Sequence, residues 1–375
     1  KTSPVLQSLL DVFTEIDDPR VARTRAHPLV NILTMSLFGA LAGADGWEAL
    51  EDYAEVQEEF FAEFLDMPYG TPSADTFRRV FEALDPQAFQ LAFRSWLEPL
   101  LGDLEGQTVA IDGKTLRGAL SHARGRRGPF HLLHVWATEQ RLLLAQSAVE
   151  TAGHESAAAI ELLRGLHLQG ATVTSDAASC NAEVTRAIRE RGAHYVLALK
   201  GNQSKLHDHV RQCFDTAPRS EALLAVENDK AHGRLERRIV RAMAIGELPE
   251  SVKAPWADLK SVVEVIRIRS SKKLSITRSF YITSHLPKAK KLATHIRDHW
   301  KIENELHYVL DVTFGEDRRK IRSENGAQNF ALVCRHALSL IKRDPRKKSV
   351  AMKKRIAMWN PRRALELLNC GFHAV

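Results

Sequence analysis

The spacing of apolar residues changes along the chain, and at first it indicates helices. Up to about residue 104, apolar residues recur three or four positions apart, as they do on one face of an α-helix. The stretch GWEALEDYAEVQEEFFAEFL has this spacing through Trp47, Leu50, Tyr53 and Phe60. We therefore expect a helical N-terminal region.

From residue 106 to 200 the pattern consists of short apolar runs separated by helical segments. Runs typical of strands occupy 108–112, 130–137, 141–149, 171–175 and 194–199, and helical spacing occupies 155–168 and 181–191. Three strands in a row followed by alternating helices and strands predict an α/β sheet with an antiparallel part and a parallel part.

Residues 201–285 favour a β-rich insertion, because VVEVIRIRS and ITRSFYITS look like paired strands and HGRLERRIVRAMAI like another strand. Helical spacing returns from about 287 to 310, and again from 323. The predicted organisation has three parts. They are a helical N-terminal domain at 1–104, an α/β domain at 105–345 that contains the insertion at about 201–285, and a basic C-terminal tail at 346–375.

Composition adds a candidate partner. The 375 residues carry a formal net charge of +7, and ten Lys or Arg stand against one acid between Lys342 and Arg363. Nucleic acid is a plausible partner for such a chain, although a solvated basic face explains the same run. The four cysteines form no C-x-x-C pair, which fits a reducing cytosol and excludes a thiolate zinc site. The chain contains no run of about 18 uncharged apolar residues, so no membrane-spanning helix is predicted.

Two acids are expected at strand ends. The run TVAID ends on Asp112, and the run ATVTSD ends on Asp176. Ligands of α/β sheets bind at the carboxyl ends of the strands, so these two carboxylates are candidates for one site.

A third acid comes from the helix near residue 300. His299, Glu303, His307 and Asp311 recur four residues apart, so they share one face if the helix continues past 310. A solvated face explains this stripe equally well. If the face is turned inward, two aspartates and Glu303 form the acid set that two Mg²⁺ ions need for phosphoryl transfer.

A helix near residue 73 is a candidate for DNA recognition. TPSADTFRRVFEAL starts with a helix-start signal at Ser73, and it places Phe77 and Phe81 on one face and Arg78 and Arg79 on another. This pattern is compatible with a helix-turn-helix, and also with an ordinary helical bundle.

Other polar residues near the predicted strand ends are candidate phosphate contacts. Surface solvation, turn formation or a salt-bridged face explains the same residues. The candidates are Lys114, Arg117, Lys200, Asn202, His232 and Arg234.

Several long segments resemble one family. AIDGKTLRG, TSDAASCNAEVTRAIRERGAHYVLALKGNQ, HGRLERR, RDHWKIENELHYVLDVTFGEDRRKIR and NFALVCRHALSLIK occur in the order found in DDE-type insertion-sequence transposases of the ISAs-type, H-repeat-associated family. The resemblance covers most of the chain, including the helical N-terminal region.

The resemblance implies a ribonuclease H-like catalytic domain with a β-rich insertion. It implies that Asp112, Asp176 and Glu303 are the catalytic, metal-binding acids, with two Mg²⁺ ions per site and Mn²⁺ as a substitute. The wider superfamily has Arg and Lys near the third acid, where this chain has His299 and Leu310. His299 is able to hydrogen-bond a phosphate, whereas Leu310 is not.

The expected activity follows from the resemblance. Such a protein binds the terminal inverted repeats of its element, cleaves the ends and joins the 3′-hydroxyls to target DNA. Its partners are double-stranded DNA and a second copy of itself, and its place is the bacterial cytoplasm, on the nucleoid when bound to DNA. The alternatives are a transposase-derived DNA-binding protein that does not cut, and a zinc hydrolase that uses His299, Glu303 and His307.

Overall fold

The computed structural model describes residues 2–121, 128–149, 154–217, 223–231, 234–246, 248–270 and 274–373. The helices are α1 Pro4–Thr14, α2 Leu29–Ala42, α3 Trp47–Val56, α4 Glu58–Ala62, α5 Ala74–Ala83, α6 Pro86–Leu101, α7 Glu155–Arg164, α8 Ala182–Glu190, α9 Ser204–Thr216, α10 Glu250–Lys253, α11 Ala289–Lys301, α12 Tyr308–Val312, α13 Glu324–Arg343, α14 Val350–Trp359 and α15 Pro361–His373. The strands are β1 Thr108–Ser121, β2 Gly128–Ala137, β3 Leu142–Val149, β4 Thr172–Ser175, β5 His194–Leu199, β6 Leu223–Ala231, β7 Arg234–Ala244, β8 Ser261–Ser270 and β9 Leu274–Thr283.

All nine strands form one mixed sheet in the order β3-β2-β1-β4-β5-β9-β8-β7-β6. β1 pairs antiparallel with β2 and parallel with β4, and β4 pairs parallel with β5. This confirms the expected α/β sheet with an antiparallel and a parallel part. The predicted β-rich insertion supplies β6 to β9, and it extends the same sheet because β9 pairs with β5.

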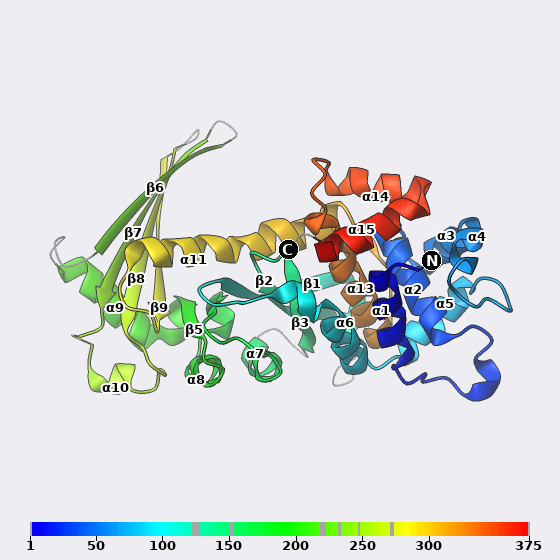
Figure 1. Ribbon diagram of the computed structural model, residues 1–375. Helices are drawn as coiled ribbons and strands as arrows, with labels where there is room; N and C mark the ends of the chain where they lie inside the picture. Colours follow the sequence, from blue (N-terminus) through cyan, green and yellow to red (C-terminus); the bar gives the residue numbers. More distant parts are fainter. Residues whose placement is uncertain are drawn as a thin grey trace.

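Helices cover both faces of the sheet, and α11 is the element that matters for the site. It lies along one face, while α7 and α8 lie on the other (Figure 1). Apolar residues fix both packings: Leu292 and Ile296 of α11 pack with Val240 and Val263 of the extension. On the opposite face, β1 and β4 share a core with α7 and α8.

The helical region and the sheet share a core. Phe38 and Phe81 of the N-terminal helices belong to one apolar cluster with Leu132 of β2 and Phe330 of α13. The segment expected as a basic tail joins this cluster too, because α14 and α15 pack on α2 and α13. The Ser3 hydroxyl donates to the Asn369 side chain at 2.8 Å, so α15 closes against the start of the chain.

Serine side chains cap α5 and α13, and one of these serines, Ser73, is the helix-start signal seen in the sequence. The Ser73 hydroxyl accepts a hydrogen bond from the Thr76 N–H at the start of α5, and Ser323 caps α13 in the same way through Gly326. No single helix in the described part of the chain is long and apolar enough to cross a membrane; α2 and α3 meet that test only as a pair, which is bent by 96°.

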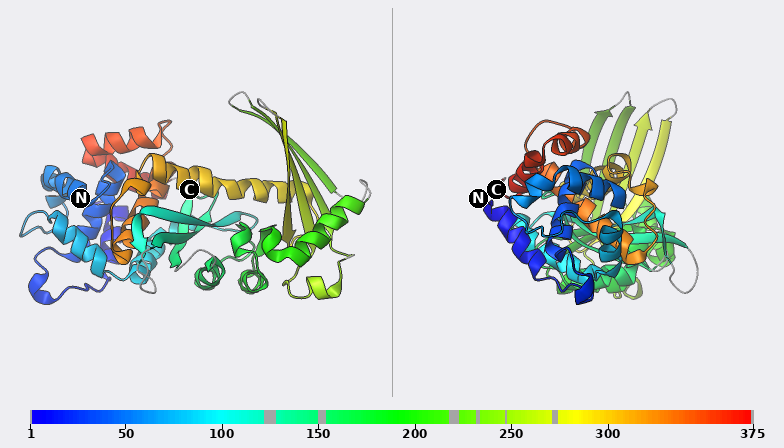
Figure 2. Two further views of the ribbon diagram at one scale, coloured as in Figure 1. Left: turned by 180° about the vertical axis from the view of Figure 1, so that it is seen from behind. Right: turned by 90° about the vertical axis from the view of Figure 1, so that its right-hand side faces the viewer.

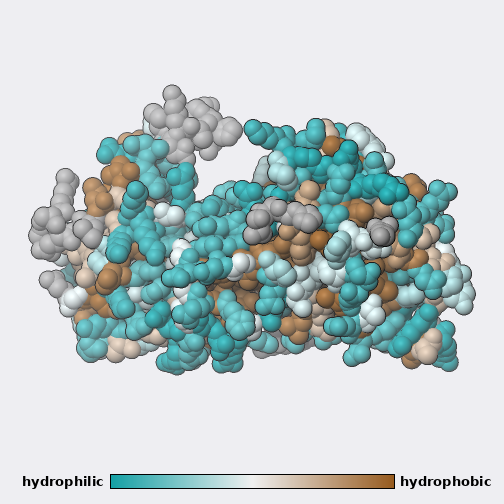
Figure 3. Space-filling model, viewed as in Figure 1, coloured by the Kyte–Doolittle hydropathy of each residue, from teal (hydrophilic) through white to brown (hydrophobic). Residues whose placement is uncertain are grey.

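The two ends of the molecule differ in shape. The four strands β6 to β9 project at the end opposite the helical region, and α11 runs between the two (Figure 2). The surface is hollowed between the projecting strands and the helical region, and its floor is mainly hydrophilic (Figure 3). We call the projecting strands β6 to β9 the blade.

Candidate active site

The parallel pairing of β1 and β4 brings the two aspartates to the same edge. Ile111 is the partner of Ser175, the last residue of β4, so Asp112 and Asp176 follow at corresponding positions. The expectation that Asp112 ends its strand is wrong, because β1 continues to Ser121 beside β2. Asp112 instead lies where the parallel neighbour stops.

Asp176 is held by its own loop. Its carboxylate accepts a hydrogen bond from the Ala178 N–H at 3.0 Å, at the start of a short 3₁₀ turn, Ala177–Ser179. Asn202 donates to the Ala177 carbonyl at 2.7 Å, and Gln203 donates to the Cys180 carbonyl at 3.0 Å. Asn202, predicted as a DNA contact, therefore has a structural partner that anchors the loop after Asp176.

The helix that carries the third acid changes its winding at the site. α11 continues without a break into a π-helical segment, Ile302–His307, and then into α12. The predicted polar stripe turns inward along this path. His299 contacts the Thr174 hydroxyl at 3.1 Å, His307 contacts Asp112 at 3.3 Å and Asp311 contacts Lys114 at 2.5 Å. A π-helical turn is common at functional sites, and here it lies at Glu303.

The three acids influence one another. Burial and the charge of Asp112 raise the pKa of Asp176, against the hydrogen bond from Ala178 and the charge of His299. Glu303 is exposed, yet partial burial of its carboxyl and the charges of Asp112 and Asp176 raise its pKa. Two elevated pKa values with like charges among the causes mean that the acids repel one another, which a cation would relieve.

Asp112 and Asp176 line a polar pocket of about 190 Å³ together with Glu155, whereas Glu303 is not among its lining residues. Within the described residues, no three His, Cys, Asp or Glu side chains are already gathered closely enough to hold a metal ion. The donor set nevertheless suits a hard cation, because carboxylate oxygens are the ligands that Mg²⁺ prefers.

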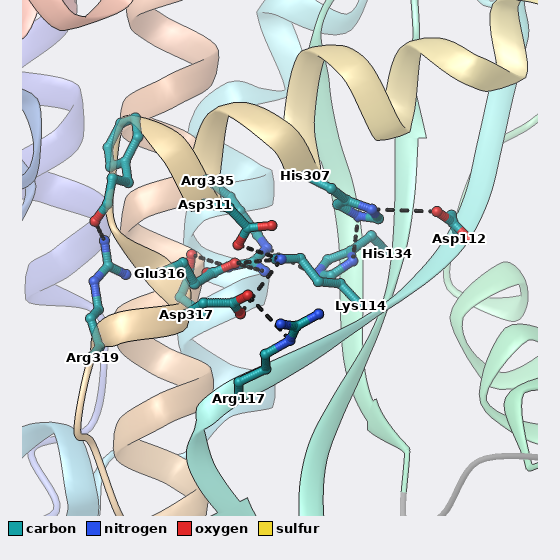
Figure 4. Close-up of polar contacts among 12 residues, drawn as sticks. Asp112, Lys114, Arg117, His134, His307, Asp311, Glu316, Asp317, Arg319 and Arg335 are labelled. Atoms are coloured by element: carbon teal, nitrogen blue, oxygen red, sulfur yellow. Dashed lines mark hydrogen bonds and ion pairs between the residues drawn. The ribbon is translucent and has the colours of Figure 1, made fainter.

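Behind Asp112 lies a buried chain of polar side chains that the sequence interpretation missed (Figure 4). His307 contacts Asp112 through Nδ1 and His134 of β2 through Nε2, the latter at 3.2 Å. Arg335 of α13 donates from Nε to His134 Nε2 at 2.9 Å and binds Glu316 through both terminal nitrogens, at 2.7 and 3.2 Å. The available signal was a charge, Arg335, within the apolar run ALVCRHALSLI.

Glu316 stays ionised although it is buried. Burial favours the neutral acid, but Arg335, Arg319 and Lys114 outweigh it and hold the pKa of Glu316 below its ordinary value. A close backbone contact fixes its loop, because a Cβ at Gly118 of β1 would collide with the carbonyl of Arg319.

Lys114 does not lie where a phosphate would reach it. It is 9% exposed, and its ammonium contacts Asp311, with Glu316 at 4.0 Å and Asp317 at 3.9 Å. The surroundings of Lys114 therefore contradict the expectation that it contacts DNA. Arg117 differs, because 80% of its side chain is exposed beside Asp317.

The remaining predicted DNA contacts are scattered. Lys200 is exposed at the end of β5. On α5, Arg79 is exposed and Arg78 is half-buried, and both pair with Asp75. Arg234 begins β7, and His232 lies outside the described residues.

An exposed aromatic ring lies on α11. Trp300 is 38% exposed, and the Arg267 guanidinium of the blade lies 5.2 Å from its ring centre. The zinc-hydrolase alternative fails on geometry, because both ring nitrogens of His307 already face Asp112 and His134. It also leaves Asp112 and Asp176 without a role.

The comparison with protein families agrees with this arrangement. Residues 103–340 match the family model described as transposase DDE domain, and residues 10–97 match one described as DDE_Tnp_1-associated. The chain belongs to the DDE transposase family. Insertion-sequence proteins of this kind act on DNA, and their DDE domains generally use divalent metal ions.

Curated relatives cover most of the chain. It is 31% identical to the H repeat-associated putative transposase YhhI of Escherichia coli K12, over 90% of this chain and 91% of that protein. It is 32% identical to the putative protein YbfL of the same organism, again over 90% and 91%. It is 41% identical to an uncharacterized protein in the dhlA 3′ region of Xanthobacter autotrophicus, over 73% of this chain and 93% of that protein.

Proposed function

We propose that this protein is an active DNA transposase that binds the terminal inverted repeats of its element, cleaves the ends and transfers the 3′-hydroxyls to target DNA. We propose a ribonuclease H-like catalytic fold for it. The order β3-β2-β1-β4-β5, with only β2 antiparallel to its two neighbours, supports this assignment.

The observation that carries the proposal is the meeting of three acids from three elements. Asp112 comes from β1, Asp176 follows β4 and Glu303 lies in the π-helical segment, and their charges are coupled. These residues would hold two Mg²⁺ ions, or Mn²⁺ in their place. Such ions activate the attacking water or hydroxyl and stabilise the leaving oxygen. The chain's own part is to fix the acids and to position the phosphodiester.

The surface suggests a route for DNA. The hollow between the blade and the helical region has α11 along its floor (Figure 3). Arg238, Arg267 and Arg269 lie together on the α11-facing side of the blade, around Glu236. Arginine is suited to bind phosphate, and an exposed aromatic ring such as Trp300 is suited to stack on a base. Arg117, Lys200 and Arg234 stay candidate DNA contacts, and His299 and His232 are candidates with them.

We propose that the helical region contributes to recognition of the element ends through α5. If Arg78 and Arg79 enter a major groove, each bidentate contact with guanine discriminates by roughly 1–3 kcal/mol. Both arginines are paired with Asp75, so they would have to exchange that partner for DNA. Joining two element ends requires two such sites, which supports a homodimer in the DNA complex.

The decisive experiment is cleavage of DNA that carries the element's own ends, with Mg²⁺ and separately with Mn²⁺, and with the cuts mapped to the nucleotide. Wild-type protein should cut at the ends, and Asp176→Asn should not. Asp208→Asn is the matched control, because it removes an exposed acid of α9 that lies away from the site. End binding without any cut in either metal would instead favour a DNA-binding protein derived from a transposase.

A further inference from the structure

The polar chain behind Asp112 has a direction that can be worked out from its chemistry. An arginine Nε carries a hydrogen and can only donate. Arg335 Nε lies 2.9 Å from His134 Nε2, so that ring nitrogen must accept and carries no hydrogen. The proton of neutral His134 is therefore on Nδ1, which faces His307 Nε2 at 3.2 Å.

The same reasoning carries over to the next ring. His134 Nδ1 donates, so His307 Nε2 accepts and the proton of His307 is on Nδ1. That nitrogen lies 3.3 Å from Asp112 Oδ2, so the protonated side of the His307 ring faces the carboxylate. A second proton on either ring would place two N–H groups against each other. Both rings are therefore neutral, with their protons on the side of Asp112.

Arg335, at which this chain of polar contacts begins, is held rigidly. Arg335 is fully buried, and besides Glu316 it donates to the Ala331 carbonyl at 2.9 Å. Burial, followed by the charges of Arg335 and Lys114, holds the pKa of His134 well below its ordinary value, while the Asp112 backbone carbonyl opposes them. The His134 ring, which contacts His307 and lies near the cations of Arg335 and Lys114, therefore stays uncharged.

We propose that Arg335 is a positioning residue for Asp112: through His134 it fixes the His307 tautomer, so that His307 orients the carboxylate and presents Oδ1 to the metal. This rests on the proposed function, in which Asp112 binds metal. Among the described residues, Oδ1 of Asp112 has no hydrogen-bond donor, and it remains available to a cation. His307 itself has no free lone pair, so it serves as a support for a metal ligand and not as a ligand.

The first test reads the tautomers directly and needs no metal. In full-length protein with ¹⁵N-labelled histidine rings, two-bond proton–nitrogen correlation spectra distinguish the protonated from the bare nitrogen, and the variants described below assign the signals. His134 and His307 should both be neutral with the proton on Nδ1. A proton on Nε2 of His307 in the wild type would overturn the proposal.

The second test separates the two nitrogens of His307 by substitution. An asparagine amide reaches the place of Nδ1, whereas a glutamine amide reaches the place of Nε2. His307→Asn should therefore keep the support of Asp112, and His307→Gln should lose it. With Mn²⁺ alone as the probe, His307→Gln should bind at least about tenfold more weakly than His307→Asn, the typical loss for a support residue of a metal ligand. Equal affinities would contradict the proposal.

The third test moves the change away from Asp112. Arg335→Met combined with Glu316→Gln removes the donor to His134 without leaving a buried unpaired carboxylate. His307 should then show the Nε2 proton in part of the population, and Mn²⁺ binding should weaken in parallel. An unchanged His307 tautomer would show that Arg335 does not set it.

A control identifies effects of lost stability. His295→Asn removes another buried histidine of α11, one whose partners are Thr108 and Thr172, and it should leave Mn²⁺ affinity unchanged. A wild-type protein that binds no Mn²⁺ would count against the proposed function. The tautomer spectra would then still decide whether Arg335 directs this chain.

Discussion

Two groups of histidines lie where the helix that begins with α11 packs on the sheet, and they differ in their partners. Towards the amino ends of β1 and β4, the partners are mainly hydroxyls: Thr172 contacts both His285 and His295, and Thr108 contacts His295. Towards the carboxyl ends, the partners include ions, because His307 contacts Asp112 and His134 contacts Arg335. The threonine group comprises His194, His285 and His295, and the site group comprises His134, His299 and His307.

The difference shows how one helix face serves two purposes. In the threonine group, burial is the largest cause of the depressed histidine pKa values, which reach about 3 for His285 and about 4 for His295. Those rings are neutral and act as packing with hydrogen bonds. In the site group, burial again lowers the pKa of His299, but Asp112 and Asp176 oppose it. Spacing along the helix is shared, and it is the strand partners that distinguish structure from function.

Removing an acid should have the largest effect and should separate the two groups. Asp112→Asn, Asp176→Asn or Glu303→Gln should each reduce end cleavage by more than about 10³-fold, because metal binding supplies several kcal/mol of transition-state stabilisation. DNA binding in a gel-shift assay should change little. His295→Asn should leave the cleavage rate per folded molecule unchanged. Near-normal cutting by an acid variant would remove that acid from the site.

Breaking the buried ion pair behind the site group should cost the most stability. Glu316→Gln leaves Arg335 buried without its counterion, and loss of one partner of such a pair typically costs about 3–5 kcal/mol. The threonine group contains no comparable ion pair among its described hydrogen bonds. Urea unfolding followed by circular dichroism measures the loss. A change below about 1 kcal/mol would mean that water replaces the carboxylate.

A matched pair of substitutions on β4 should sharpen the contrast. Thr172→Val removes the hydroxyl shared by His285 and His295, and it should lower the free energy of unfolding by about 1–3 kcal/mol because buried ring nitrogens lose a partner. Thr174→Val removes only the contact with the half-buried His299. We expect less than about 1 kcal/mol there, with a larger effect on cleavage. The reverse order in unfolding experiments would invalidate the distinction.

The smallest effect is a dependence of stability on pH. The pKa of His295 is about 4 in the folded chain against an ordinary 6.5, so the unfolded chain takes up its proton first as the pH falls. Its contribution is complete above pH 6.5 and is lost progressively from there towards pH 4. At pH 5.5 the loss is about 1 kcal/mol. His295→Asn should flatten the profile between pH 7.5 and 5.5, and an unchanged slope would assign it to other groups.

The three acids and the polar stripe on the helix near residue 300 could be predicted from the sequence, because strand runs and helical spacing are local patterns. The strand run before Asp112, the strand run before Asp176 and the four-residue spacing through Glu303 can be recognised without tertiary contacts. In the structure the charges of Asp112 and Asp176 act on Glu303, although the three carboxylates are not gathered closely enough to hold a metal ion. The support for Asp112 was not predictable in this way. Arg335 meets His134 across 201 residues of sequence, and only the packing of α13 against β2 joins them.

Lys114 shows why a neighbouring acid in the sequence is a poor guide to DNA contact. It stands two residues after Asp112, but the loop that carries Glu316 folds over it. Asn202 is exposed and stays a candidate DNA contact, although its amide donates to the Ala177 carbonyl. A residue type and its neighbours define what a side chain is able to bind, whereas the return of a distant segment decides whether it stays accessible.

The closure of α15 on α1 has a consequence for synthesis of the chain. Leu367 and Leu368 belong to the same apolar cluster as Phe13 and Phe38, and Asn369 accepts the hydrogen bond from Ser3. The first hundred residues emerge from the ribosome long before these partners exist. Their apolar faces therefore stay partly exposed to water and to chaperones until α15 has been synthesised. A chain truncated before α15 would leave part of the apolar surface of its first helices uncovered.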